Sequence, residues 1–151
     1  MDIEEIISKS KCFGYENGMW SYRLTAPGFD EDIDLHIRGD ENEPYEDALT
    51  IAQNIIINFT DYRDSGLCML KYWITDFNES KYSLKCIQIT DCLNCGHYND
   101  TLKTPYSPDV FYLTWWGAGD DADVWDFNVQ FINSHNRKEV FQPGSVEFHH
   151  A

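Results

Sequence analysis

The sequence predicts an α+β fold, in which an antiparallel β-sheet carries a helical hairpin packed on one face. Two kinds of periodicity indicate this class. Apolar and polar residues alternate over 20–24 and again over 33–37, which is typical of half-buried strands. Between 44 and 62, apolar residues recur at helical spacing as one broad stripe. Strands on both sides of this helical region favour helices gathered on one face of an antiparallel sheet.

The N-terminal part of the chain is expected to form a short helix followed by a hairpin. Residues 2–9 place three isoleucines at helical spacing. The strands 20–24 and 33–37 flank the turn-forming pair Pro27 and Gly28. We therefore expect these two strands to pair with each other.

The helical region is expected to contain two helices. Pro44 suits the first helical position, since the N–H that proline lacks has no partner there. Acidic residues in the first turn favour the positive end of the helix dipole. Residues 64–66, Asp-Ser-Gly, interrupt the apolar stripe, and a second helix is expected from 65 to 76. We interpret the stripe as part of the hydrophobic core.

The C-terminal half is expected to add further strands to the sheet. A strand begins at Tyr82, and its alternation breaks near Cys86, which a β-bulge would explain. Residues 91–109 are expected to form a long loop, a kind of segment that is often functional in compact domains. The remaining strands are predicted at 110–116, 124–132 and 146–149.

The strands 110–116 and 124–132 are expected to form a hairpin closed by residues 117–123. That register pairs Trp116 with Val124, Thr114 with Asp126, and Tyr112 with Asn128. The alternate residues are uniformly apolar and are expected to face the helices. They are Phe111, Leu113, Trp115, Trp125, Phe127 and Val129. The mixed outer face either meets a partner or lies under another loop or the C-terminal segment.

The composition indicates one soluble domain spanning residues 1–151. A hydrophobic fraction of 42% and an aromatic fraction of 15% exclude a disordered chain. The net charge of −15 repels phosphate and anionic lipid, so it disfavours nucleic acid and membranes as ligands. It favours a basic protein partner, although it could also serve solubility alone. Acids at the N-terminus and the lack of a long apolar run predict a cytoplasmic protein.

The cysteines of the chain include a candidate metal site. Five cysteines, an odd number, fit a reducing compartment better than a disulfide framework. Cys86, Cys92, Cys95 and His97 supply the right chemistry for tetrahedral zinc. Structural zinc sites usually pair two closely spaced motifs, however, and this chain has only one. Ordinary thiols are therefore favoured and no cofactor is expected, with zinc binding and redox activity as the alternatives.

Neither calcium binding nor catalysis has a matching motif. The acidic stretch 120–126 has Trp125 at the fifth position of a calcium-binding loop and Asp126 where the loop needs glycine. A cation site of another kind is the alternative for these acids. The chain also lacks the nucleophile, zinc-protease and phosphate-binding motifs that hydrolases and transferases use. His36 is expected on the polar side of its strand near Asp34, which fits a solvated face better than an active site. A non-enzymatic protein is therefore expected, with a small hydrolase as the less favoured alternative.

The layout of the chain resembles the small acidic immunity proteins that bacteria encode beside polymorphic or contact-dependent growth inhibition toxins. The resemblance rests on the alternating stretches WSYRL and IDLHI, the helix ALTIAQNIIINF, and the late strand with the pattern W-x-F-x-V-x-F. It covers residues 19–132. It implies a cytosolic, non-enzymatic protein that binds one cognate toxin domain and blocks its active site.

Two patches are predicted to contact such a partner, on the basis of strand face and charge. Tryptophan and tyrosine are common anchors of protein interfaces, and nearby carboxylates can meet lysine or arginine. The first patch contains Tyr112, Trp116, Asp120, Asp121, Asp123 and Asp126. The second contains Asp30, Glu31, Asp32 and Asp34. The expected partner is a basic protein toxin, with a nuclease as one candidate because a nuclease must attract phosphate.

Overall fold

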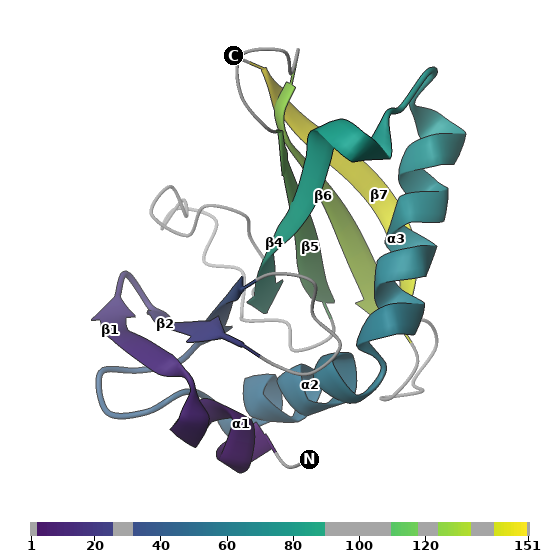
Figure 1. The fold of residues 1–151 in the computed structure, drawn as a ribbon. Coiled ribbons are helices and arrows are strands. Elements are labelled where there is room, and N and C mark those ends of the chain that lie inside the picture. The colour runs from purple at the N-terminus through teal and green to yellow at the C-terminus, as the bar shows by residue number, and fades with distance from the viewer. Residues whose placement is uncertain (1–2, 26–31, 90–109, 118–123, 134–140, 151) are drawn as a thin grey trace, which may run out of the picture.

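The computed structural model describes residues 3–25, 32–89, 110–117, 124–133 and 141–150. Within these ranges the chain forms three α-helices, one short 3-10 helix and seven β-strands (Figure 1). All seven strands belong to one sheet, in which their spatial order is the same as their order along the chain. The predicted α+β class is confirmed.

The elements follow one another with short connections where the chain is described. The helices are α1 (Ile3–Lys9), α2 (Glu46–Ile57), α3 (Phe59–Trp73) and the 3-10 helix η1 (Glu79–Lys81). The strands are β1 (Lys11–Glu16), β2 (Met19–Leu24), β3 (Ile33–Arg38), β4 (Tyr82–Ile89), β5 (Val110–Gly117), β6 (Val124–Asn133) and β7 (Phe141–His150). Figure 1 shows α3 beside β6 and β7, and α1 with α2 near the end of the sheet that carries β1 and β2.

The sheet is mixed rather than purely antiparallel. Five neighbouring strand pairs are antiparallel, and β3 pairs with β4 in parallel. Parallel neighbours need a crossover connection, since the chain must return to the same end of the sheet. Helices α2 and α3 make that crossover. The predicted antiparallel arrangement is therefore corrected at this one pair.

The break between the two long helices lies at Asn58 and not at residues 64–66. Its backbone N–H donates to the carbonyl of Asn54, and its side-chain amide donates to the same carbonyl at 3.0 Å. The carbonyl of Asn58 then accepts a hydrogen bond from the N–H of Tyr62 at 3.1 Å, and this bond forms the first turn of α3. Gly66 lies inside α3 and is buried, so the Asp-Ser-Gly stretch is helical. The predicted helices 44–62 and 65–76 are corrected accordingly.

Two strands differ from the sequence prediction at the edges of the sheet. Strand β1 is not anticipated, because its side chains are mostly exposed and a register shift between Cys12 and Gly14 breaks the alternation. Strand β7 begins at Phe141, five residues before the predicted start at 146. Edge strands lack a second neighbour, so their sequences carry a weaker alternation than central strands.

The central strands follow the predicted alternation of faces. The bulge expected near Cys86 is present, as a register shift between Leu84 and Cys86. In the β5–β6 hairpin, Trp116 pairs with Asp126 instead of Val124, so the predicted register is wrong by two residues. A shift of two residues keeps every side chain on its predicted face, which is why the apolar pattern alone cannot distinguish the two registers.

The hydrophobic core lies between the helices and one face of the sheet. A row of buried residues crosses four strands on this face and comprises Leu35, Ile87, Leu113 and Val129. The rings of Phe111 and Phe131 stack with centroids 4.7 Å apart, and Tyr62 of α3 meets both rings edge-on. No helix among the described residues is long and apolar enough to cross a membrane.

Candidate functional site

The side of the sheet away from the hydrophobic core carries polar residues in rows that cross the strands. We call this side the polar face. One row runs from β2 to β7 and comprises Ser21, His36, Gln88, Tyr112, Gln130 and Ser145. The next row comprises Arg23, Asp34, Cys86, Thr114, Asn128 and Glu147. Trp116 and Asp126 lie opposite each other one step further along β5 and β6.

The polar face brings together residues from both predicted patches. Asp34 of β3 shares a row with Thr114, which lies two positions before Trp116 on the same face of β5. Asp32 lies two positions before Asp34, immediately before β3, and accepts a hydrogen bond from Thr25. Sequence reasoning placed the patches on separate segments, and the parallel pairing of β3 with β4 brings Asp34 onto the same surface as Trp116 and Asp126.

A chain of hydrogen bonds crosses the centre of the polar face from β4 to β6. The amide Nε2 of Gln88 donates to the Thr114 hydroxyl at 3.2 Å. That hydroxyl donates to Oδ1 of Asn128 at 2.6 Å, and Nδ2 of Asn128 donates to Asp126 at 2.9 Å. Thr114 and Asn128 are buried. The chain links buried polar groups to the carboxylate of Asp126, which holds that carboxylate in place beside Trp116.

Tyr112 is buried in a second chain of hydrogen bonds, which corrects the expectation that it is accessible to a partner. Its ring is only 4% exposed. Its hydroxyl accepts from Nε2 of Gln130 at 3.0 Å, and the Oε1 atom of that glutamine accepts from Ser145 at 3.1 Å. Tyr112 does face the same side as Trp116, as predicted. Its place in the structure is that of an internal hydrogen-bonding group.

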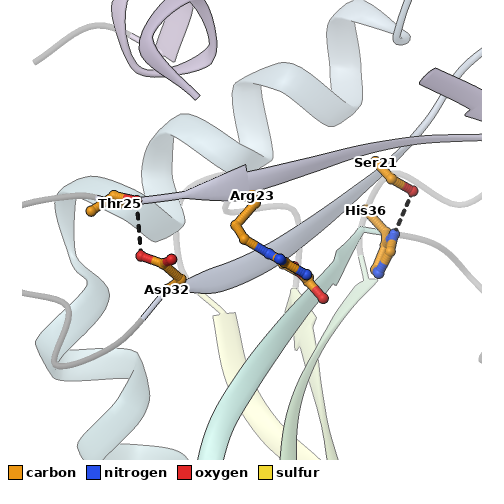
Figure 2. Close-up of polar contacts among 6 residues, drawn as sticks. Ser21, Arg23, Thr25, Asp32 and His36 are labelled. Carbon is orange, nitrogen blue, oxygen red and sulfur yellow. Dashed lines mark hydrogen bonds and ion pairs between the residues drawn. The ribbon is translucent and has the colours of Figure 1, made fainter. Parts of the chain in front are cut away.

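Three polar pairs join β2 and β3 at the other end of the polar face (Figure 2). The Thr25 hydroxyl donates to Asp32 at 2.8 Å. Nε of Arg23 donates to the carboxylate of Asp34 at 3.0 Å, and this hydrogen bond raises the pKa of the guanidinium. The charge of Asp34 is therefore partly balanced by Arg23. Asp32 is exposed and accepts from a neutral hydroxyl.

Ser21 and His36 form the third pair, which has the composition of a nucleophile with a base. The Ser21 hydroxyl lies 2.8 Å from Nδ1 of His36. Burial lowers the pKa of His36, against an opposing effect from the charge of Asp34, so the ring favours its neutral form. Catalysis through such a pair also needs an acid that orients the base and a group that stabilises an oxyanion. The carboxylate of Asp34 is instead held by Arg23.

Trp116 is the large aromatic side chain that this end of the polar face exposes to solvent. Its side chain is 47% exposed, whereas that of its neighbour Trp115 is 2% exposed and lies in the core. Asp126, directly across the strand pair, is half-buried. The prediction that these two tryptophans point to opposite sides of the sheet, with Trp116 outward beside an acid, is confirmed.

The other predicted contact residues lie outside the described part of the chain. They are Asp30, Glu31, Asp120, Asp121 and Asp123. Their expected role as contact residues stays a prediction. The same holds for the loop predicted over 91–109.

Of the four candidate zinc ligands, only Cys86 lies in the described part of the chain. Cys86 is buried in the second row of the polar face, opposite Thr114. Burial raises the pKa of its thiol, and the charge of Asp34 adds to this, so the protonated form is favoured. Cys92, Cys95 and His97 fall outside the described residues. Among the described residues no three His, Cys, Asp or Glu side chains are grouped to hold a metal ion.

Sequence reasoning missed a cavity on the opposite side of the sheet from the polar face. It has a volume of about 340 Å³ and lies between α3, η1 and the start of β4. Its lining includes Phe59, Arg63 and Asp64 from α3 and Tyr82 from β4. Gly66 was the available signal, because a glycine inside a helical stretch often marks a place where another element approaches the backbone closely.

The described surface thus offers two features that could engage another molecule. One is the end of the polar face that carries Trp116 and Asp126. The other is the cavity beside Tyr82, which pairs with Gly117 at the same end of the sheet. No protein-family model, curated protein or solved structure matches this chain.

Proposed function

We propose that the protein is a non-enzymatic immunity protein, which binds a cognate toxin domain with a basic surface and neutralises it. The observation that carries the proposal is Trp116, a 47% exposed tryptophan that lies directly opposite Asp126 on the polar face. An exposed aromatic ring beside a carboxylate provides the combination that protein interfaces use for affinity and for recognition of basic groups.

The rigidity of this surface supports the proposal. Asp126 accepts a hydrogen bond from Asn128, which in turn is held by the buried Thr114 hydroxyl. A carboxylate fixed in this way loses little conformational freedom when a partner binds, and this lowers the entropic cost of association. Trp116 has few rotatable bonds and adds a large contact area at a similarly low cost.

The charge of the whole protein supports a basic partner. A chain with a net charge of −15 attracts a basic surface over about 8 Å at physiological ionic strength. Such attraction raises the association rate more than it raises the affinity of the final complex. A nuclease toxin has a cleft that attracts phosphate, so it presents the opposite field to this protein.

The test measures binding to the toxin domain encoded beside this protein's gene. Trp116→Ala should weaken binding by about 2 kcal/mol, or roughly 30-fold, mainly through faster dissociation. Asp126→Asn keeps an oxygen that can accept from Asn128 and removes the charge. It should lower the association rate and make that rate less dependent on salt. Surface plasmon resonance at two salt concentrations measures both effects.

Matched controls come from the helical side of the molecule. Trp73 on α3 is 66% exposed, and Asp47 on α2 is exposed as well. Trp73→Ala and Asp47→Asn should leave the toxin affinity unchanged. The proposal is wrong if Trp116→Ala and Asp126→Asn behave like these controls, or if the purified protein does not bind the toxin domain at all.

A further inference from the structure

We infer that the cavity between α3, η1 and β4 receives an arginine side chain of the basic partner. This inference rests on the proposed function, since the arginine belongs to the toxin domain. The cavity volume of about 340 Å³ is at the lower end of the range for small-ligand sites, which suits one long side chain. The walls, the charges and the position of the cavity each support arginine.

The walls provide fixed aromatic surface. Tyr82 is half-buried, and its ring is held by stacking on Phe77 with centroids 5.4 Å apart and by an edge contact with Phe127 at 5.0 Å. Phe59 and Trp115 are buried and also line the cavity. A planar guanidinium packs well on aromatic rings and is weakly hydrated, so it enters such a site at a lower cost than an ammonium group.

The charged side chains of the lining favour a cation. Asp64 and Glu79 contribute two carboxylates and Arg63 contributes one guanidinium, so the charged lining sums to −1. Arg63 lies 3.5 Å from Asp64, which is a long ion pair. Glu79 is paired with Lys71 at 3.2 Å, and both side chains are more than half exposed. An exposed pair such as Lys71 with Glu79 is weak and the pair of Arg63 with Asp64 is long, so an incoming guanidinium can compete for the carboxylates.

The cavity and the proposed contact surface lie at the same end of the sheet, on opposite faces. Ser83 and Leu84 line the cavity, and they pair across the sheet with Trp116 and Trp115. Trp115 therefore contributes to the cavity while the next residue, Trp116, projects from the polar face. A partner that covers this end of β4 and β5 meets both features, so one arginine can enter the cavity while other groups contact Trp116.

The experiment uses N-acetyl-L-arginine amide as the probe and the indole N–H signal of Trp115 as the readout. NMR titration should give a saturable shift of this signal, with a dissociation constant of about 1 mM for a ligand of this size. The signal is assigned with Trp115→Phe. N-acetyl-L-citrulline amide has nearly the same shape without the charge, and it should give no saturable shift.

Variants connect the cavity to the partner. Glu79→Gln and Asp64→Asn should each weaken probe binding, together by about tenfold or more, because they remove charge-assisted hydrogen bonds. The same pair should weaken the toxin complex, whereas the control Asp47→Asn should change neither. Both substitutions are at exposed side chains, so the fold is expected to be retained.

The possible outcomes separate this inference from the proposed function. If the arginine probe gives no shift at Trp115, or if citrulline binds equally well, the inference is overturned and Trp116-dependent toxin binding stands. If the probe binds but Glu79→Gln with Asp64→Asn leaves toxin affinity unchanged, the partner does not place arginine in the cavity and the inference is again overturned. If the toxin does not bind the unaltered protein, the proposed function fails and the inferred occupant fails with it.

Discussion

Gly66 determines how closely α3 approaches the sheet. A Cβ atom added to this glycine would lie 2.5 Å from the Cη2 atom of Trp115, which is far inside van der Waals contact. The indole is 2% exposed, so most of its surface is already in contact with other residues. Glycine is therefore required for steric reasons within an ordinary helix, and its flexibility plays no part.

The first prediction is that Gly66→Ala destabilises the protein by about 1–3 kcal/mol through overpacking against Trp115. In an open helix the same change would stabilise by about 1 kcal/mol, because alanine has the higher helix propensity. The sign of the change in the free energy of unfolding, measured by urea denaturation, therefore tests the contact. Ser65→Ala, the adjacent substitution, serves as the control, and a stabilising Gly66→Ala would show that the ring does not lie against the helix.

The second prediction concerns His36, whose pKa burial lowers below the ordinary value of about 6.5. Between the lowered pKa and about pH 6.5, the unfolded state binds more protons at this residue than the folded state. Stability should therefore fall as the pH falls through this window. His36→Asn cannot titrate but keeps an acceptor near Ser21, so its unfolding free energy should depend less on pH than that of the unaltered protein.

Ser21→Ala provides the control for the cause of this pH dependence. It removes the hydroxyl near Nδ1 and leaves the histidine buried. The pH dependence should persist in this variant, because burial is the larger cause of the lowered pKa. Equal pH profiles for the unaltered protein and His36→Asn, measured by denaturation from pH 5 to 7.5, would contradict the prediction.

At the scale of elements, β4, β5 and β6 are joined by side chains as well as by backbone hydrogen bonds. Thr114 lies at the centre, where its hydroxyl accepts from Gln88 and donates to Asn128. Buried polar groups that satisfy one another specify which residues lie opposite each other, because a register slip would leave them without partners. This link positions the two strands that carry Trp116 and Asp126.

The third prediction is that Thr114→Val destabilises the sheet by about 1–3 kcal/mol, because it leaves the buried Oδ1 atom of Asn128 and the half-buried amide of Gln88 without the hydroxyl. Valine has nearly the same shape as threonine, so packing is preserved. Thr25→Val at an exposed site should change stability by less than about 0.5 kcal/mol. Chemical denaturation measures both variants, and equal effects would mean that the buried hydroxyl contributes nothing.

At the scale of the whole molecule, charge opposes folding while it favours a basic partner. The chain carries 26 acidic and 11 basic side chains, excluding histidine. Several basic residues are held in surface ion pairs, such as Lys9 with Glu5 and Arg23 with Asp34. The remaining excess of carboxylates repels itself more strongly in the compact state than in the unfolded chain.

The fourth prediction is that added salt stabilises the protein at neutral pH. Raising NaCl from about 10 mM to about 300 mM shortens the screening length to below about 8 Å and weakens the repulsion. For a chain of this length, each 1 kcal/mol of relieved repulsion should raise the Tm by about 2–4 °C. Calorimetry measures the shift. The effect should disappear near the isoelectric pH, and a Tm that falls with salt at neutral pH would contradict the prediction.

The sequence by itself determined the class of the fold and the face on which most central side chains lie. Alternation along a strand is local, so Trp115 and Trp116 could be assigned to opposite sides of the sheet without any knowledge of their neighbours. The apolar stripe of α2 is likewise a local feature, because the spacing of its residues along the sequence places them on one side of the helix. The placement of Trp116 and an acid on the same outer face was therefore predictable, although the exposure of Trp116 and its exact partner across the hairpin were not.

Only the tertiary structure decided the register of β5 with β6, the parallel pairing of β3 with β4, and the burial of Tyr112. Each of these depends on contacts between segments that are distant in the chain, and a local pattern is equally compatible with several arrangements of such segments. The cavity beside Tyr82 is a further case, because its walls come from β3, α3, η1, β4 and β5. Its existence depends on how closely α3 can approach Trp115, which is a property of packing in three dimensions.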